Sequence, residues 1–153
     1  MLHPTHIHQL EHQHELVVQI FRRTSPASWK AQPEPGKWSM HDQLAHLARY
    51  QQVFLGRMQE ILDHDGVSFQ RYVAENDPQF AVTQNESTEN LLELLLKTRA
   101  EIVSRAHSLS AEESGRKGIH PVFGPMDITT WIEFFLVHEG HHLFSVFKLS
   151  RTA

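Results

Sequence analysis

Cysteine is absent from the 153-residue chain, which excludes disulfide bonds and thiolate metal ligands. There is no run of Lys or Arg and the net charge is −4, so no nucleic-acid partner is expected. No apolar stretch approaches the roughly 18 to 20 residues of a membrane helix. The N-terminus also lacks the cationic start and apolar run of a signal peptide. These absences predict a soluble, cytoplasmic protein without membrane contacts.

Histidine, in contrast, is abundant, at 13 residues. Five histidines lie near the N-terminus: His3, His6, His8, His12 and His14. We interpret them as a polar helix start, with incidental metal affinity as the alternative. The composition, 40% hydrophobic and 21% charged, is that of an ordinary globular protein. Its length fits one domain over residues 1–153.

Helical periodicity recurs four times along the chain, whereas strand signals are scarce. The expected helices cover about residues 6–23, 39–64, 87–109 and 127–149. Ser39 and Asp42 form an S-x-x-D start typical of a capping box, and Asp127 is the expected N-cap of the fourth helix. Four helices of this length predict an all-α fold, a four-helix bundle.

The connection between the second and third helices is long for a bundle hairpin, at about 22 residues. Such a connection can cross the bundle and leave these two helices parallel. Within it, the segment E-N-D-P-Q-F (75–80) is expected to form an ordered loop.

The segment V-H-E-G-H-H-L (137–143) contains His138-Glu139-x-x-His142, the pattern of many zinc proteases. Residues four apart share one helix face, so both imidazoles can bind one ion. In such proteases the Glu is the general base and a third ligand usually lies downstream. The tail after His142 contains no His, Asp or Glu, and little chain remains to build a peptide-binding site. The sequence therefore disfavours a protease.

A third ligand must come from upstream, and His46 in the second helix is the best candidate. It lies about 10 Å from the start of its helix, and the His138–His142 pair lies about 13 Å from the end of the fourth. Antiparallel helices would thus bring the three imidazoles to one level. His46 is expected at the edge of the core face, and the other two within the apolar stripe. We expect His41 to be exposed and His141 to flank the site.

Several alternatives stay open at this point. Two buried imidazoles without partners would cost several kcal/mol, which either a metal ion or hydrogen bonds to other helices would offset. Glu139 is a candidate general base, with a solvated helical glutamate as the alternative. Asp42 could orient His46, although helix capping is the preferred role. Trp38 and Trp131 are interpreted as packing residues.

Three segments, taken in order, resemble the DinB/YfiT-like superfamily of metal-dependent four-helix bundles. They are P-G-K-W-S-M-H-D-Q-L-A-H-L-A-R-Y-Q (35–51), N-D-P-Q-F (76–80) and H-P-V-F-G-P-M-D-I-T-T-W-I-E-F-F-L-V-H-E-G-H-H-L-F (120–144). The resemblance covers nearly the whole chain and is weak only across the first helix. It implies an up-down-down-up bundle with a long crossover between helices two and three. It also implies a divalent metal bound by His46, His138 and His142.

Three neutral imidazoles leave positions open for water or substrate, as in catalytic sites. Zn²⁺, Ni²⁺, Mn²⁺ and Fe²⁺ would all accept these ligands. Some relatives resemble thiol S-transferases and others hydrolases. The leading hypothesis is therefore a metal-dependent enzyme acting on a small substrate, either a thiol S-transferase or a hydrolase. The alternative is a noncatalytic, metal-stabilised bundle that acts through protein partners, and we expect a homodimer.

Overall fold

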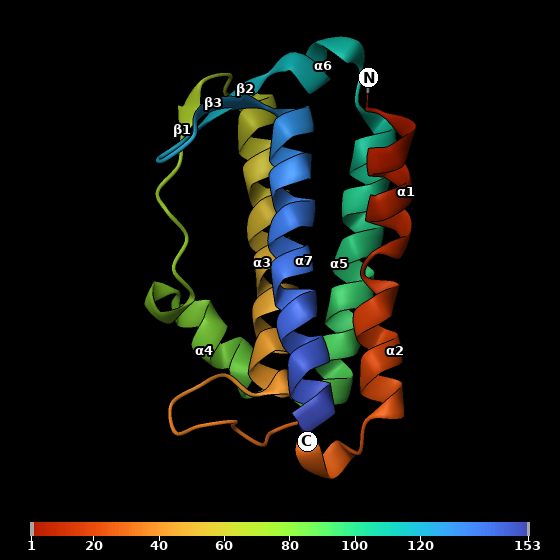
Figure 1. Cartoon of the computed structure of the whole chain (residues 1–153). Coiled ribbons are helices and arrows are strands. Elements are labelled where there is room, and N and C mark those ends of the chain that lie inside the picture. Colours follow the sequence, from red (N-terminus) through yellow and green to blue (C-terminus); the bar gives the residue numbers. More distant parts are fainter. Residues whose placement is uncertain (1, 153) are drawn as a thin grey trace.

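The computed structural model describes residues 2–152 and shows a bundle of long helices with a small sheet at one end (Figure 1). In chain order the helices are α1 (Pro4–His12), α2 (Glu15–Arg23), α3 (Met40–Asp63), α4 (Pro78–Gln84), α5 (Thr88–Ser108), α6 (Ala111–Gly115) and α7 (Ile128–Thr152). The strands are β1 (Val67–Ser68), β2 (Lys117–His120) and β3 (Gly124–Asp127), and the 3-10 turns are η1 (Pro26–Ser28) and η2 (Ala74–Asn76). Within residues 2–152, no helix is long and apolar enough to cross a membrane.

Side-chain contacts give the relative directions of the long helices. His41 of α3 bonds to Thr88 of α5, and ten residues later Gln51 bonds to Arg99, so α3 and α5 run parallel. The order of the contacts between α3 and α7 is reversed, because Gln43 meets His142 while His46 meets His138. These two helices are therefore antiparallel (Figure 1). The predicted four-helix bundle is confirmed, and the long connection after α3 crosses from one end of the bundle to the other.

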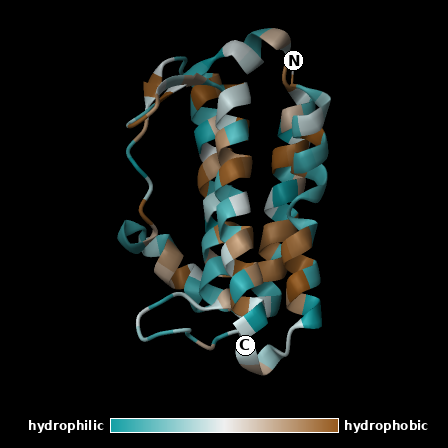
Figure 2. Ribbon diagram, viewed as in Figure 1, coloured by the Kyte–Doolittle hydropathy of each residue, from teal (hydrophilic) through white to brown (hydrophobic). Residues whose placement is uncertain are grey.

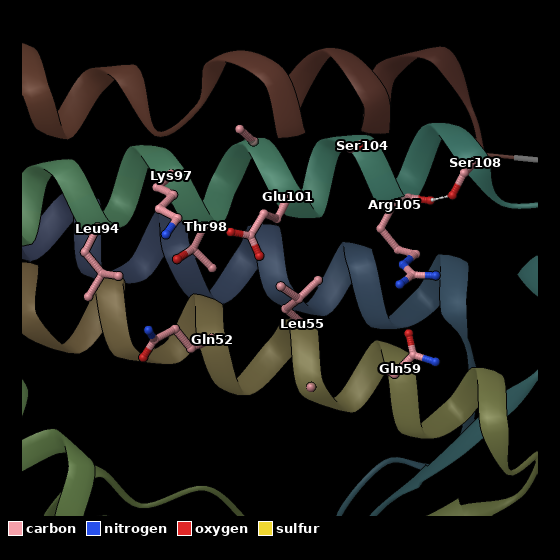
Figure 3. Close-up of a pocket in the computed structure, with 12 residues that line it drawn as sticks. Gln52, Leu55, Gln59, Leu94, Lys97, Thr98, Glu101, Ser104, Arg105 and Ser108 are labelled. Carbon is pink, nitrogen blue, oxygen red and sulfur yellow. Dashed lines mark hydrogen bonds between the residues drawn. The ribbon is translucent and has the colours of Figure 1, made fainter.

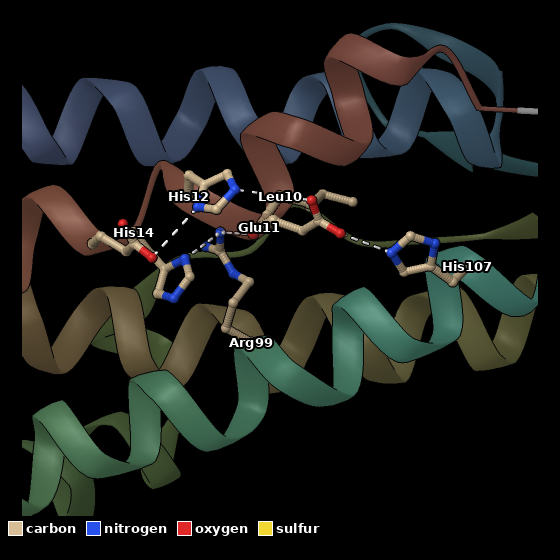
Figure 4. A network of polar contacts seen from close by, with 7 residues as sticks. Leu10, Glu11, His12, His14, Arg99 and His107 are labelled. Carbon is tan, nitrogen blue, oxygen red and sulfur yellow. Dashed lines mark hydrogen bonds and ion pairs between the residues drawn. The ribbon is translucent and has the colours of Figure 1, made fainter.

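The first expected helix is broken in two, which corrects the prediction of one helix over residues 6–23. At the break, the Leu10 carbonyl accepts a hydrogen bond from Arg99 Nη1 at 3.0 Å, and His14 Nδ1 lies 3.4 Å from the same nitrogen (Figure 4). Gln13 Nε2 donates to the Leu136 carbonyl at 2.9 Å. A buried guanidinium needs acceptors, and the chain supplies one of them at the point where α1 ends.

Two capping predictions are confirmed. The Ser39 hydroxyl accepts from the Asp42 backbone N–H, and Asp42 Oδ2 accepts from the Ser39 backbone N–H at 2.9 Å, a capping box at the start of α3. At the start of α7, Asp127 Oδ1 accepts from the Thr130 backbone N–H at 2.8 Å. Both long helices that carry the candidate ligands therefore begin at residues fixed by local chemistry.

A three-stranded sheet in the order β1-β2-β3 covers one end of the bundle, and the sequence did not predict it. β1 pairs parallel to β2, and β2 pairs antiparallel to β3 with His120 opposite Gly124. The strands have two to four residues, too few for alternation to stand out. In β2 the buried positions are Gly118 and His120, so the sheet turns His120 toward the bundle.

The connection between α3 and α5 is ordered, as predicted for residues 75–80, and contains η2 and α4. Asp77 anchors it by accepting from Arg49 Nε at 2.6 Å, from the Tyr72 hydroxyl at 3.1 Å and from the Gln79 backbone N–H at 3.0 Å. These bonds hold the connection against α3.

Hydrophobic side chains make up most of the buried core. Along each long helix, hydrophobic residues are interspersed with hydrophilic ones (Figure 2). Phe54 and Phe135 stack near the middle of the bundle with ring centroids 4.4 Å apart. Trp131 is fully buried and donates its indole N–H to the Gly118 carbonyl at 3.3 Å. The core thus joins α7 both to α3 and to the sheet.

Candidate metal centre

His46, His138 and His142 converge between α3 and α7. The Nε2 atom of His138 lies 3.2 Å from the Nε2 atoms of both His46 and His142. One ligand atom from each residue lies within 4.8 Å of the others, and this is the one such group of three found in residues 2–152. The structure therefore brings together the three histidines that the sequence selected.

The chemistry of these nitrogens fits a divalent cation. His138 Nε2 has two close nitrogen neighbours but can hold only one proton or one lone pair. A proton there could bond to one neighbour, and a lone pair would have to accept from both. A cation removes this conflict because all three lone pairs can point at it. Two Zn–N bonds of about 2.0 to 2.1 Å at a tetrahedral angle would separate the nitrogens by about 3.3 Å, close to the 3.2 Å found.

Burial keeps the three imidazoles neutral. Desolvation, reinforced by the other histidines, lowers the pKa of His46 to about 2, of His138 to about 3 and of His142 to about 4. Metal binding requires the neutral imidazole. Near neutral pH the site therefore presents unprotonated nitrogens.

Gln43 orients one of the rings. Its Oε1 accepts a hydrogen bond from His142 Nδ1 at 2.7 Å, which leaves the lone pair of His142 on Nε2, the atom that faces the other histidines. The Nδ1 atoms of His46 and His138 are buried without a protein partner. Gln43 lies three residues before His46, so both side chains leave α3 on neighbouring positions of one face.

The three histidines line a cavity of about 590 Å³. Aromatic side chains form much of its wall, and two arginines and a further histidine line it as well: Arg57, Arg71 and His120. The Tyr50 ring lies 4.1 Å from the His138 ring, centroid to centroid. Burial raises the pKa of Tyr50, so its hydroxyl stays protonated and can donate a hydrogen bond into the cavity.

A second hollow, of about 950 Å³, lies between α3 and α5 (Figure 3). Its wall consists of helix-surface residues such as Gln52, Lys97 and Glu101. It contains no histidine, and none of its lining residues belongs to the group of converging ligands. The chemistry therefore points to the smaller cavity.

Glu139 does not join the three histidines, which counts against its expected role as general base. Its carboxylate forms an ion pair with Arg99 and accepts from Gln13 Nε2 at 3.0 Å. It is 1% exposed, so the alternative of a solvated glutamate is wrong. Glu139 occupies the buried stripe of α7, and His138 and His142 lie half-buried at its edge rather than within it.

Two other histidines also bear on the predictions. His41 was expected to be exposed, but it is 3% exposed, and its Nε2 donates to the Gln84 carbonyl at 2.9 Å. Its Nδ1 lies 2.8 Å from the Thr88 hydroxyl, so His41 ties α3 to the end of the crossover. His141 is exposed and flanks the site, with its ring 5.1 Å from that of His142.

No role was predicted from the sequence for Gln43, Tyr50, Arg57 or His120. Helical spacing could have found three of them, because Gln43, Tyr50 and Arg57 lie three, four and eleven residues from His46 and so share its face of α3. Trp38, interpreted as packing, also lines the cavity, and its ring lies 5.1 Å from that of His46. The place of His120 in the cavity could not be predicted, because it depends on a sheet that the sequence did not reveal.

Comparison with known proteins gives a family match and several similar folds. The family model described as the DinB superfamily matches residues 9–144. A search of curated proteins finds no match. Among solved structures, YfiT from Bacillus subtilis, described as a probable metal-dependent hydrolase with an unusual four-helix bundle topology, is 17% identical, with a TM-score of 0.83 over 97% of this chain and 85% of that one.

Two further structures are similar in fold. TT2238, described as a four-helix bundle protein, is 20% identical, with a TM-score of 0.68 over 93% of this chain and 95% of that one. YjoA from Bacillus subtilis, described as a DinB-like protein, is 14% identical, with a TM-score of 0.64 over 97% and 91% of the two chains. At these identities the likeness concerns the fold.

Proposed function

Since the chain belongs to the DinB superfamily, we propose that it is a metal-dependent enzyme whose divalent ion is held by His46, His138 and His142. The observation that carries this proposal is the convergence of three neutral imidazoles on one point in the wall of a cavity. A closed structural site would use a fourth protein ligand. Here the fourth side faces a space of about 590 Å³, which is large enough for a small substrate.

The reaction class that we propose is thiol S-transfer or hydrolysis of a small substrate. When bound, the ion would lower the pKa of a coordinated thiol or water and so provide a nucleophile near neutral pH. The description of YfiT as a probable metal-dependent hydrolase supports the hydrolytic alternative for a protein of this fold. The transferase alternative is supported by the resemblance of the sequence to the DinB/YfiT-like superfamily, some members of which resemble thiol S-transferases.

The chain's own residues would orient the substrate and supply hydrogen bonds. The Tyr50 ring lies beside that of His138, and its protonated hydroxyl can donate to an oxygen that gains negative charge during the reaction. Trp38 and Phe134 narrow the cavity with apolar surface and limit the water that reaches the site. The buried carboxylate of Glu139 takes no part, because it is bound to Arg99.

Cobalt substitution tests the open site. Protein purified without a His-affinity column is loaded with Co²⁺, and a small thiol such as 2-mercaptoethanol is added. We expect one Co²⁺ per chain and a new thiolate-to-cobalt absorption band. A stoichiometric cobalt spectrum that no thiol, azide or other small ligand alters would contradict an open catalytic site.

A second candidate function is a metal-stabilised bundle that acts through a second copy of the chain. The outer face of α7 favours it, because Val137, Phe144 and Phe147 are 74%, 60% and 43% exposed. Apolar side chains grouped on one helix face are typical of contact surfaces. Analytical ultracentrifugation of the wild type and of Phe144→Glu distinguishes the two: a dimer that Phe144→Glu dissociates, together with an inert cobalt spectrum, would favour this candidate.

A further inference from the structure

Arg57 is a buried cation in the wall of the histidine cavity. It is 9% exposed, and its guanidinium lies 5.2 Å from the centroid of the Phe69 ring and 5.6 Å from that of Trp131. Its Nη2 donates to the Gln70 carbonyl at 2.8 Å. Aromatic faces, the Gln70 carbonyl and the nearby Tyr50 hydroxyl hold the group in place, but none of them is anionic, so its charge is not neutralised.

No carboxylate supplies that neutralisation within residues 2–152. None of the ion pairs there involves Arg57 or Arg71, the exposed arginine that lines the same cavity. Glu75 also lines the cavity but is exposed and pairs with neither. A charged group is costly to bury unless it is paired. The missing partner of Arg57 is therefore expected to come from outside the chain.

His120 adds a hydrogen-bond donor at the same place. Its Nδ1 accepts from the backbone N–H groups of Val122 and Phe123, both at 3.1 Å, so the ring proton lies on Nε2. Burial lowers the pKa of His120, and the charges of Arg57 and Arg71 lower it further. The ring therefore stays neutral, and the nearby positive potential favours a negatively charged guest.

The spacing along α3 places this positive region away from the three histidines but on the same side of the helix. Arg57 lies eleven residues after His46, which is close to three full turns. The rise over this interval is about 16 Å. Arginine side chains lean toward the N-terminal end of their helix. Arg57 lies close to the Tyr50 hydroxyl, and the Tyr50 ring lies 4.1 Å from that of His138. The guanidinium is therefore nearer to the histidines than the helix rise alone suggests, at roughly 10 Å.

We propose that Arg57, Arg71 and His120 bind an anionic group of the substrate, a carboxylate or phosphate, while its reacting end lies at His46, His138 and His142. The substrate is then a small elongated molecule with the two groups roughly 10 Å apart. This inference rests on the proposed function for the reacting end, but the anion site itself needs only the chain's own residues.

Ligands of graded length test the geometry. The Co²⁺-loaded protein is titrated with 3-mercaptopropionate, 6-mercaptohexanoate and 8-mercaptooctanoate, each against the mercapto alcohol with the same number of carbons. The cobalt absorption band reports thiol binding. We expect the longer acids to bind at least about tenfold more tightly than their alcohols, the gain of a charge-assisted hydrogen bond. The shortest acid should show little preference.

Single substitutions show which residues produce the preference for mercapto acids over mercapto alcohols. Arg57→Met keeps an unbranched, largely apolar side chain at this buried position but removes the guanidinium and its charge, and should bring the acid-to-alcohol preference to about one. Arg71→Gln, at an exposed position that does not threaten folding, should reduce the preference in part. Arg23→Met removes one positive charge at the exposed end of α2, outside the cavity, and should leave the preference unchanged.

A second readout needs no metal. At constant ionic strength, inorganic phosphate or acetate should raise the melting temperature of the metal-free protein, and Arg57→Met should abolish the rise. The more effective anion identifies the group preferred. If these anions stabilise the protein but no thiol reaches cobalt, the anion site stands and the proposed function fails. If thiols bind without preference for acids and neither anion stabilises the protein, the anion site is refuted and the proposed function survives.

Discussion

Arg99 and Glu139 form an ion pair in which both partners are almost fully buried, with side chains 1% and 2% exposed. The Arg99 guanidinium also lies 5.0 Å from the centroid of the Phe135 ring. The glutamate of the H-E-x-x-H pattern therefore connects α7 to α5 in the core, while the two histidines of the same pattern face α3. One short motif serves two faces of one helix.

Removal of one member of this pair should weaken the fold without affecting metal binding. Glu139→Ala leaves the buried Arg99 charge unpaired, and we expect it to lower the free energy of unfolding by about 3 to 5 kcal/mol. Urea denaturation measures this. Glu133→Ala, on the exposed face of the same helix, is the control and should change little. Stability at the wild-type level in Glu139→Ala, with impaired turnover, would instead restore the role of general base.

His46→Ala should abolish stoichiometric metal binding, because it removes the only ligand that α3 contributes. Elemental analysis of protein purified without a His-affinity column measures the bound metal, a precaution made necessary by the histidines near the N-terminus. His141→Ala removes an exposed neighbouring histidine and should retain the metal. A full equivalent of metal in His46→Ala would disprove the ligand assignment.

The metal-free protein should lose stability in acid partly through His14. Burial, assisted by Arg99, lowers the pKa of His14 from 6.5 to about 4 in the folded state. Between these values the unfolded chain takes up a proton that the folded chain does not, so stability decreases as the pH falls from about 6.5 to about 4 and is unaffected above this range.

Urea titrations in the presence of a chelator, at several pH values, measure this dependence. His14→Gln should decline less steeply than the wild type across the window, and His8→Gln, which removes an exposed imidazole, should follow the wild type. Parallel curves for the wild type and His14→Gln would exclude the assignment. The three cavity histidines are present in all of these proteins, so their contribution to the pH dependence of stability is the same in each.

Two glycines should respond in opposite directions to alanine. A Cβ atom at Gly118 would lie 2.8 Å from both Ile61 Cδ1 and Phe69 Cε2, so Gly118→Ala should cost about 1 to 3 kcal/mol through overpacking. At Gly56, in the middle of α3, an added Cβ atom would have no neighbouring group within 4 Å, apart from the backbone of its own helix. Gly56→Ala should therefore stabilise the fold by about 0.5 to 1 kcal/mol. Thermal denaturation measures the stability change in each variant. If Gly118→Ala stabilised the protein as Gly56→Ala does, β2 would be able to move away from α3.

Local chemistry made much of the fold predictable. The capping box at Ser39 and the cap at Asp127 start two long helices, and both are visible as letter patterns. The periodic apolar residues then give four helical units, and the four-residue spacing of His138 and His142 places both on one face. His46 could be selected because antiparallel α3 and α7 would bring it to the same level, and the structure has that arrangement.

The burial of individual polar residues could not be predicted in this way. His41 lies on a side of α3 that looks exposed on a helical wheel, yet the crossover folds over it and supplies the Gln84 carbonyl. At the break between α1 and α2, the Leu10 carbonyl accepts a hydrogen bond from Arg99, nearly ninety residues away. Segments of only two to four residues form strands here because the tertiary structure brings their pairing partners beside them.

The sequence by itself determined the helical bundle and the three histidines, because periodicity, caps and i, i+4 spacing act over a few residues of one chain segment. Only the tertiary structure decided what surrounds those histidines: that Glu139 turns inward to Arg99, and that Arg57 and His120 share the cavity. Such neighbours come from elements far apart in the chain, and the low dielectric of the interior makes each charge depend on where its partner lies.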